Sequence, residues 1–264
     1  MPSSSSSGDH APPNYSDLQK PLEHFRANTK RLRVHPAELT LLWIICAHLV
    51  FLPWAIGAMR PWAQWISFGF SVLSFGMALM PRTYTAEHTA SNQFRLIMWP
   101  KLARFPIFWL GLGLLGYVLT QALNPAWTFQ TDGKGWWMAS TPHKDWLPTG
   151  VDVPFNRWGP WRMLLIYTAG WLTVCAMWVG FTRRRSVQVF FVTLAVNGLL
   201  VAAFGVAQRL FGNGKIYWFY KSVNDSFFSS FVYKNHAGAY LVLALAVTCG
   251  LAGWFYMRGL RRLE

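Results

Sequence analysis

The sequence contains few charged side chains and very few acidic ones. Of its 264 residues, 13% are charged and only 10 are Asp or Glu, whereas about 25% of a typical soluble domain is charged. Hydrophobic residues make up 53% of the chain, with 16 Trp and 20 Phe. This composition argues against a disordered chain and against an ordinary soluble enzyme. It predicts a protein that lies mostly within a bilayer.

Cysteine is scarce as well. The three cysteines, Cys46, Cys175 and Cys249, each lie inside an apolar run, without metal-ligand spacing or a nearby partner. We therefore expect small apolar side chains rather than a disulfide framework or a metal site. We also expect no secretory signal peptide, because the first apolar run begins late and no small-residue cleavage site follows it.

Six apolar runs are long enough to cross a bilayer, for which about 20 mostly apolar residues suffice. We expect spanning helices over residues 39–59, 61–80, 105–123, 163–181, 187–207 and 238–257. Residues 1–37 are polar and basic, and we expect a partly disordered cytoplasmic tail at the anionic inner membrane surface. Residues 38–264 form the transmembrane domain. The sequence thus predicts an all-α polytopic integral membrane protein with six transmembrane helices and two outer loops.

The net charge of +14 could indicate nucleic-acid binding, but the basic residues form short groups between apolar runs. We expect no nucleic-acid partner, because groove binding needs a continuous basic surface. With the N-terminus inside, 15 of the 24 Lys and Arg fall in inner segments and 9 in outer segments, which are longer per positive charge. The positive-inside rule therefore places both termini in the cytoplasm.

The first outer loop, residues 124–162, is rich in Trp, Pro and Gly. It has too many breakers for a helix and too few β-branched runs for a sheet. We favour an aromatic belt along the outer membrane interface, with a stacking platform for sugar rings as the alternative. Residues 82–104 are expected to lie on the inner interface.

The second outer loop, residues 208–237, is cationic and aromatic, with Asp225 as its only acid. Its cations could bind a phosphate-bearing lipid headgroup or could simply extend from helix ends to the interface. At the start of the last span, Asn235 could cap a helix whose free amides bind an anion; a plain capped helix start is the alternative. The candidate binding residues are Arg209, Lys215, Lys221, Lys234, Asn235 and His236.

The run SFVYKNHAGAYLVLALAV resembles the signature of the O-antigen ligase and O-antigen polymerase family, in which an Asn-His sequence opens a span. Upstream, FGVAQRLFGNGKIYWF is similar to the family's Gly-x-x-Gln at the end of the preceding span. The resemblance covers residues 197–250. It implies a bacterial inner-membrane glycosyltransferase of lipopolysaccharide or other cell-envelope polysaccharide biosynthesis. The donor would be undecaprenyl-pyrophosphate-linked glycan and the acceptor a periplasmic sugar such as the lipid A core.

The resemblance also implies that no cofactor or metal is needed, since the pyrophosphate-lipid is already a good leaving group. Family members have more spans, and a loop in their second half carries the essential His and Arg. The chain is therefore expected to be an N-terminal half or to work with a partner subunit. No catalytic base is assigned, although His236 is a candidate. The alternatives are a non-catalytic membrane subunit that binds lipid-linked glycan, and a lipid or glycan transporter, which the few ionisable residues within the spans disfavour.

Overall fold

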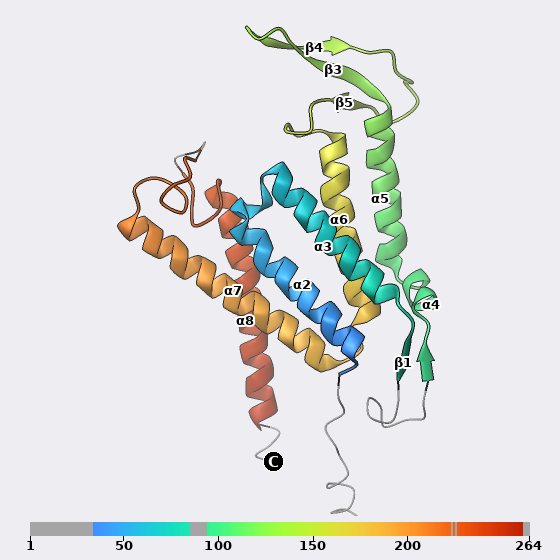
Figure 1. The fold of residues 1–264 in the computed structure, drawn as a ribbon, viewed down its shortest axis with the longest axis vertical. Coiled ribbons are helices and arrows are strands. Elements are labelled where there is room, and N and C mark those ends of the chain that lie inside the picture. The colour runs from blue at the N-terminus through green and yellow to red at the C-terminus, as the bar shows by residue number, and fades with distance from the viewer. Residues whose placement is uncertain (1–33, 85–93, 223, 225, 261–264) are drawn as a thin grey trace, which may run out of the picture.

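The computed structural model describes residues 34–84, 94–222, 224 and 226–260. The chain is mostly helical, and six of its helices are long and apolar enough to cross a membrane (Figure 1). This confirms the predicted helical class and the number of spanning helices. The predicted disorder of the tail, most of residues 1–37, lies outside the described residues, as do Asp225 and the middle of the segment 82–104.

Proline and polar residues mark the ends of the six long helices. Four of them have proline in the first turn, where its fixed φ suits a helix and its missing N–H is not needed. The two longest extend beyond the predicted apolar runs at both ends, because backbone hydrogen bonding continues into the polar flanks. The helices are α2 (Pro36–Trp54), α3 (Pro61–Leu79), α5 (Pro106–Leu123), α6 (Pro160–Gly180), α7 (Arg184–Phe211) and α8 (Lys234–Leu260).

Shorter elements connect α2 to α3 and α3 to α5. A 3-10 helix η1 (Ile56–Ala58) forms the turn between α2 and α3. An antiparallel pair, β1 (Arg82–Tyr84) and β2 (Phe94–Leu96), followed by the helix α4 (Met98–Ala103), leads from α3 to α5. We call the end of the bundle where α2 begins the tail end. The β1–β2 pair lies at this end (Figure 1). We call the opposite end, where a separate three-stranded sheet over residues 125–152 lies, the sheet end.

Helices α2, α3, α5 and α6 form the main bundle, with α6 packed on both α3 and α5. Helix α7 packs on α2, and α8 packs on α7 at the side of the bundle (Figure 1). Only 6% of the most apolar window of α8 is buried within the described structure. Most of the surface of α8 is therefore free to meet lipid or other protein helices.

Buried charges fix the tail end of the bundle. Glu38 in α2 is 0% exposed, and its carboxylate accepts hydrogen bonds from the backbone N–H groups of Thr182 and Arg183, both at 3.1 Å. It also accepts from the hydroxyl groups of Thr182 and Ser186, both at 2.5 Å. A carboxylate at this position caps the start of α7, where the helix dipole favours negative charge.

Two cations cap the nearby C-terminal end of α6. The guanidinium of Arg82 donates to the Gly180 carbonyl at 2.9 Å, and the Lys101 ammonium donates to the Val179 carbonyl at 3.1 Å. Burial lowers the pKa of Lys101, because desolvation disfavours its charged form. The two cations satisfy carbonyl groups that have no partner within the helix.

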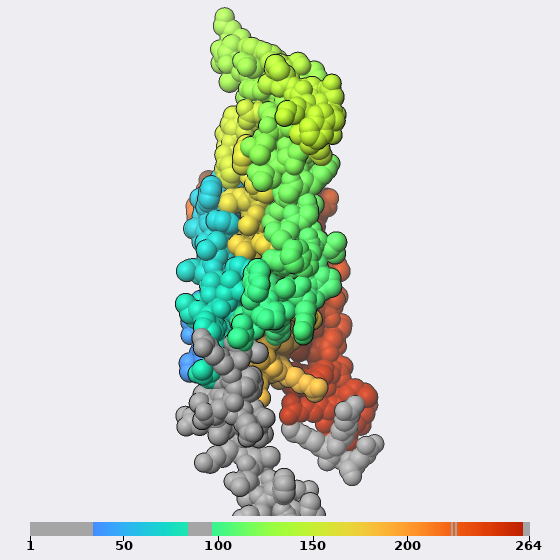
Figure 2. All heavy atoms as spheres, turned by 90° about the vertical axis from the view of Figure 1, so that its right-hand side faces the viewer, coloured from blue at the N-terminus to red at the C-terminus, as the bar shows by residue number. Residues whose placement is uncertain are grey.

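The expectation that residues 124–162 form neither helix nor sheet was wrong. Three strands form there, in the order β4 (Trp136–Ser140), β3 (Pro125–Thr131) and β5 (Gly150–Asp152). Strands β3 and β4 are antiparallel, and β3 and β5 are parallel. Aromatic and Thr residues favour strands, and the breakers that argued against a sheet lie largely in its turns. Figure 2 shows this segment as a lobe beyond the ends of the helices.

Aromatic side chains remain exposed on this lobe. Trp127, Trp136 and Trp146 are 48%, 64% and 78% exposed. The Arg157 guanidinium carbon lies 4.0 Å from the centroid of the Phe129 ring, a cation–π contact that ties the loop after β5 to β3. Both interpretations of the loop, an interfacial aromatic belt and a sugar platform, are compatible with such exposure.

Candidate functional site

The loop between α7 and α8 folds back on the sheet end of the bundle. Ile216 is fully buried, the hydroxyl of Tyr217 donates to the Trp54 carbonyl, and the guanidinium of Arg60 donates to the hydroxyl of Tyr220. Burial raises the pKa of Tyr217, so its phenol stays a neutral donor. The loop is thereby held against the end of α2 and the turn that follows it.

The end of α7 and this loop enclose a polar pocket of about 290 Å³, which we call the Gln208 pocket. Its lining includes Gly205, Gln208, Arg209, Phe227, Phe228 and Ser229. Gln208 is 4% exposed, and its amide nitrogen donates to the Lys215 carbonyl at 3.0 Å. The amide oxygen of Gln208 and the hydroxyl of Ser229 are buried without a hydrogen-bond partner in the described part of the chain.

This arrangement defines what the Gln208 pocket can bind. A buried polar atom without a partner costs about 1–3 kcal/mol, and Gln208 and Ser229, which both line this pocket, each contain one such atom. Arg209 adds a cation, and none of the described residues that line the pocket is Asp or Glu. An amide oxygen accepts hydrogen bonds from hydroxyl or amide groups, and a guanidinium pairs with anionic groups such as carboxylate or phosphate.

A second, mostly apolar cavity of about 530 Å³ lies between α2, α3 and α6, and we call it the α2–α3–α6 cavity. Its apolar lining includes Ile45, Leu49, Leu52, Ile166 and Val174. A buried hydrogen bond of 2.7 Å joins His48 to Ser67 in its wall. Trp158 and His236 also line it, so the cavity is bordered by both sequence segments predicted as outer loops.

The turn Phe228–Phe231 lies between the two cavities. Phe228 lines the Gln208 pocket and packs so closely on Gly205 that a Cβ there would lie 2.3 Å from its ring. Phe231 packs on Gly57, which lines the α2–α3–α6 cavity and has a φ of +59°. One aromatic turn therefore separates a polar pocket from an apolar cavity.

Backbone strain is concentrated around these cavities. In the described ranges, non-glycine residues with positive φ occur only in the α2–α3 turn and in the α7–α8 loop: Ile56, Ala58, Tyr217, Trp218 and Ser229. A left-handed conformation costs a non-glycine residue about 1–2 kcal/mol. Such strain persists where the surrounding contacts enforce it, and it clusters at functional sites. It supports the sheet end as the location of the site.

The structure separates the six residues predicted from the sequence. Arg209 lines the Gln208 pocket and His236 lines the α2–α3–α6 cavity. The remaining four are exposed and line neither cavity: Lys215, Lys221, Lys234 and Asn235. Of the predicted cations, Arg209 therefore lines a pocket, whereas the three lysines lie exposed outside both cavities.

The expected anion site at the start of α8 has a different geometry. The helix begins at Lys234, so Asn235 lies in the first turn and is not the N-cap. The Lys234 amide donates to the Ser226 carbonyl at 3.2 Å, and the amides of His236 and Ala237 donate to the Tyr233 carbonyl. Most of the amides that would face an anion are thus already bonded within the chain.

Gln208 and Ser229 were not among the predicted site residues. Gln208 belongs to the Gly-x-x-Gln run at the end of α7, which could have placed it in the set. No pattern in the sequence distinguishes Ser229 from its serine neighbours. Within the described ranges, no group of three or more His, Cys, Asp and Glu is arranged to hold a metal ion.

Comparison with known proteins adds no relative to this picture. The chain matches no protein-family model, no curated protein and no solved structure. The resemblance to O-antigen ligases and polymerases therefore depends on the residues quoted from the sequence.

Proposed function

We propose that the chain takes part in transferring glycan from an undecaprenyl-pyrophosphate donor to a periplasmic acceptor such as the lipid A core. The observation that carries the proposal is the Gln208 pocket beside the α2–α3–α6 cavity. The donor has the same two parts, a phosphorylated sugar and a long apolar chain. On this proposal the protein lies in a bacterial inner membrane, with both termini cytoplasmic and the sheet end periplasmic.

Each part of the site has a task in this proposal. Arg209 pairs with the pyrophosphate and stabilises the charge that develops as it leaves. Gln208 and Ser229 form hydrogen bonds with sugar hydroxyl groups, and the polyprenyl chain enters the α2–α3–α6 cavity. The exposed rim of Lys215, Lys221, Lys234 and Asn235 supplies positive potential and polar contacts that draw the anionic headgroup to the pocket.

A non-catalytic subunit that binds lipid-linked glycan for a partner enzyme is the second candidate. It is favoured by one observation: within the described ranges, no Asp or Glu lines either cavity. A general base is needed to activate the acceptor hydroxyl, and the exposed His236, which lines the α2–α3–α6 cavity, could serve.

Binding of the donor tests the proposal directly. We expect the purified chain in lipid nanodiscs to bind undecaprenyl-pyrophosphate glycan, and Arg209→Ala to weaken this binding about tenfold or more through the loss of a charge-assisted pair. Lys134→Ala is the matched control, since it removes an exposed cation that lines neither cavity and is not part of the exposed rim. Equal affinity of Arg209→Ala and the unaltered chain would contradict the proposed pocket.

Complementation separates the two candidates. The chain is expressed in a strain that lacks its own ligase or polymerase, and glycan attachment is read on a gel. Attachment that disappears with His236→Ala, while donor binding persists, supports transfer by this chain. Donor binding without attachment supports the binding subunit.

A further inference from the structure

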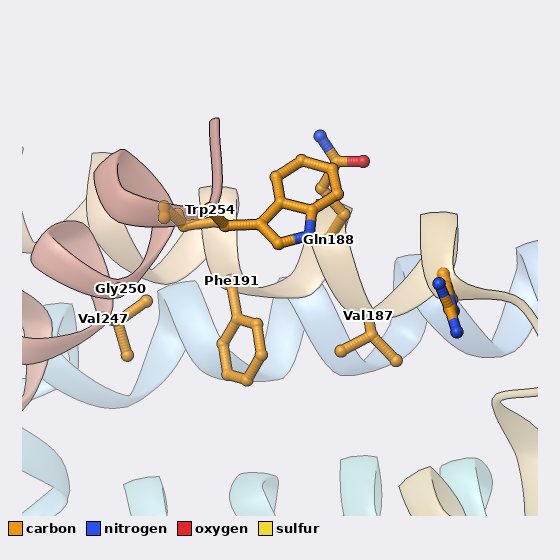
Figure 3. Close-up of a pocket in the computed structure, with 8 residues that line it drawn as sticks. Val187, Gln188, Phe191, Val247, Gly250 and Trp254 are labelled. Atoms are coloured by element: carbon orange, nitrogen blue, oxygen red, sulfur yellow. The ribbon is translucent and has the colours of Figure 1, made fainter. Parts of the chain in front are cut away.

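Helices α7 and α8 meet closely at one point and leave a crevice toward the tail end. A Cβ at Gly198 would lie 2.3 Å from the Ala244 side chain, so the two backbones approach there. Beyond this crossing the two helices line a space of about 480 Å³, which we call the α7–α8 crevice (Figure 3). Its volume is within the range of about 300–1,000 Å³ that is typical of ligand pockets.

The walls of the α7–α8 crevice are apolar along one face of each helix. Val187 and Phe191 lie one turn apart on α7, and Val247, Leu251 and Trp254 lie at helical spacing on α8. These residues are far from the Gln208 pocket, whose lining comes from the other end of α7. The crevice therefore is a separate feature and does not depend on the proposed glycan transfer.

The charges of the α7–α8 crevice are all positive and lie at its tail end. Arg184 lines it at the first turn of α7, with Gln188 one turn further on. The guanidinium carbon of Arg258 lies 5.3 Å from the ring centroid of Trp254, which adds a second cation. Helices α7 and α8 contain no Asp or Glu, and no acidic side chain of the described residues pairs with Arg184.

We propose that the α7–α8 crevice binds one anionic phospholipid from the leaflet at the tail end. Its acyl chain lies between Phe191 and Leu251, and its phosphate pairs with Arg184, while the Gln188 amide donates to a headgroup oxygen. An apolar crevice with cations at only one end matches an amphiphile with one anionic end. Basic pockets between membrane helices bind anionic headgroups by the same physics.

The test uses the whole chain and native mass spectrometry from detergent micelles with added phosphatidylglycerol or phosphatidylcholine. We expect one phosphatidylglycerol to remain bound while phosphatidylcholine is released. Arg184→Gln should weaken phosphatidylglycerol binding about tenfold, the loss expected of one charge-assisted pair. Arg185→Gln, which removes an exposed neighbour that does not line the crevice, should leave it unchanged.

A second variant fills the apolar part of the same crevice. A Cβ at Gly250 meets no atom within 4 Å, so the side chain of Gly250→Leu starts in open space, and Leu also favours the helix. We expect this variant to lose the bound phospholipid. Equal retention of both lipids, equal affinity of Arg184→Gln and Arg185→Gln, or a dimer that carries no lipid would overturn the proposal.

Discussion

At the scale of single residues, buried polar groups decide how this chain packs and where it can bind. Glu38 is satisfied by four hydrogen bonds from the segment that starts α7, and it therefore stabilises the bundle. Gln208 and Ser229 are buried without full pairing, and they are the polar groups of the proposed donor pocket. Sequence alone does not separate the two cases, because it does not show which polar side chains lack a partner.

Removal of the Glu38 carboxylate should destabilise the fold strongly. In Glu38→Ala, four donors at the start of α7 lose their acceptor, and we expect the free energy of unfolding to fall by about 3 kcal/mol or more. Thermal unfolding in detergent micelles measures the change. Glu38→Gln keeps one acceptor oxygen and should lose less. Similar unfolding temperatures for Glu38→Ala and the unaltered chain would show that the buried network contributes little.

At the scale of elements, the long helices were predictable and the connections were not. Each spanning helix contains a long apolar run. In a bilayer, a helix satisfies all backbone hydrogen bonds of such a run within the run itself. The strands β3, β4 and β5 lie outside that constraint, and their pairing depends on turn geometry. Asp132 accepts from the amides of Lys134 and Gly135 at 3.0 and 2.8 Å, and Gly133 supplies the positive φ of the turn. The Asp and Gly residues of this turn are breakers in the sequence, and breakers of this kind led to the prediction that no sheet forms here.

The turn between β3 and β4 should weaken in acid. Hydrogen bonds from the amides of Gly135 and Lys134 lower the pKa of Asp132 below its usual value of 3.8. A carboxyl with a lowered pKa in the folded state stabilises the fold above its unfolded pKa, and that stability is lost as the pH falls through the folded pKa. We therefore expect hydrogen exchange of the Gly135 amide to accelerate relative to Ala139 below about pH 3.8.

Asp132→Asn is the control for this titration. Its amide oxygen keeps an acceptor in the turn but does not titrate, so the acid-dependent step in the Gly135 to Ala139 exchange ratio should disappear. A step of the same size in Asp132→Asn would assign the acid dependence to another group.

At the scale of the whole molecule, the two ends of the bundle have different chemistry. The tail end carries Arg183, Arg184 and Arg185 and the buried Glu38 and Arg82, while the sheet end carries the two cavities and the strained turns. The number of spanning helices follows from the sequence. The division of the predicted site residues between two cavities does not, because it depends on how one loop packs against the end of α2.

The orientation of the bundle can be measured with single cysteines. In a chain with Cys249 replaced by Ala, the remaining Cys46 and Cys175 are buried. We expect Lys134→Cys to react with a membrane-impermeant maleimide in intact cells, since the positive-inside rule places the sheet outside. Arg185→Cys should react only after the membrane is permeabilised. The opposite pattern would reverse the orientation and move the proposed donor site to the cytoplasm.

The hydrogen bonds of Glu38 also limit when this end of the bundle can fold during synthesis. Its partner Thr182 is synthesised 144 residues later. At about 5–20 residues per second, this delay amounts to about 7–29 s. During that interval the first helix carries an unpaired carboxylate, which is costly in hydrocarbon. The nascent helix must therefore keep this end at the membrane surface, in contact with water or the insertion machinery, until the fifth spanning helix arrives.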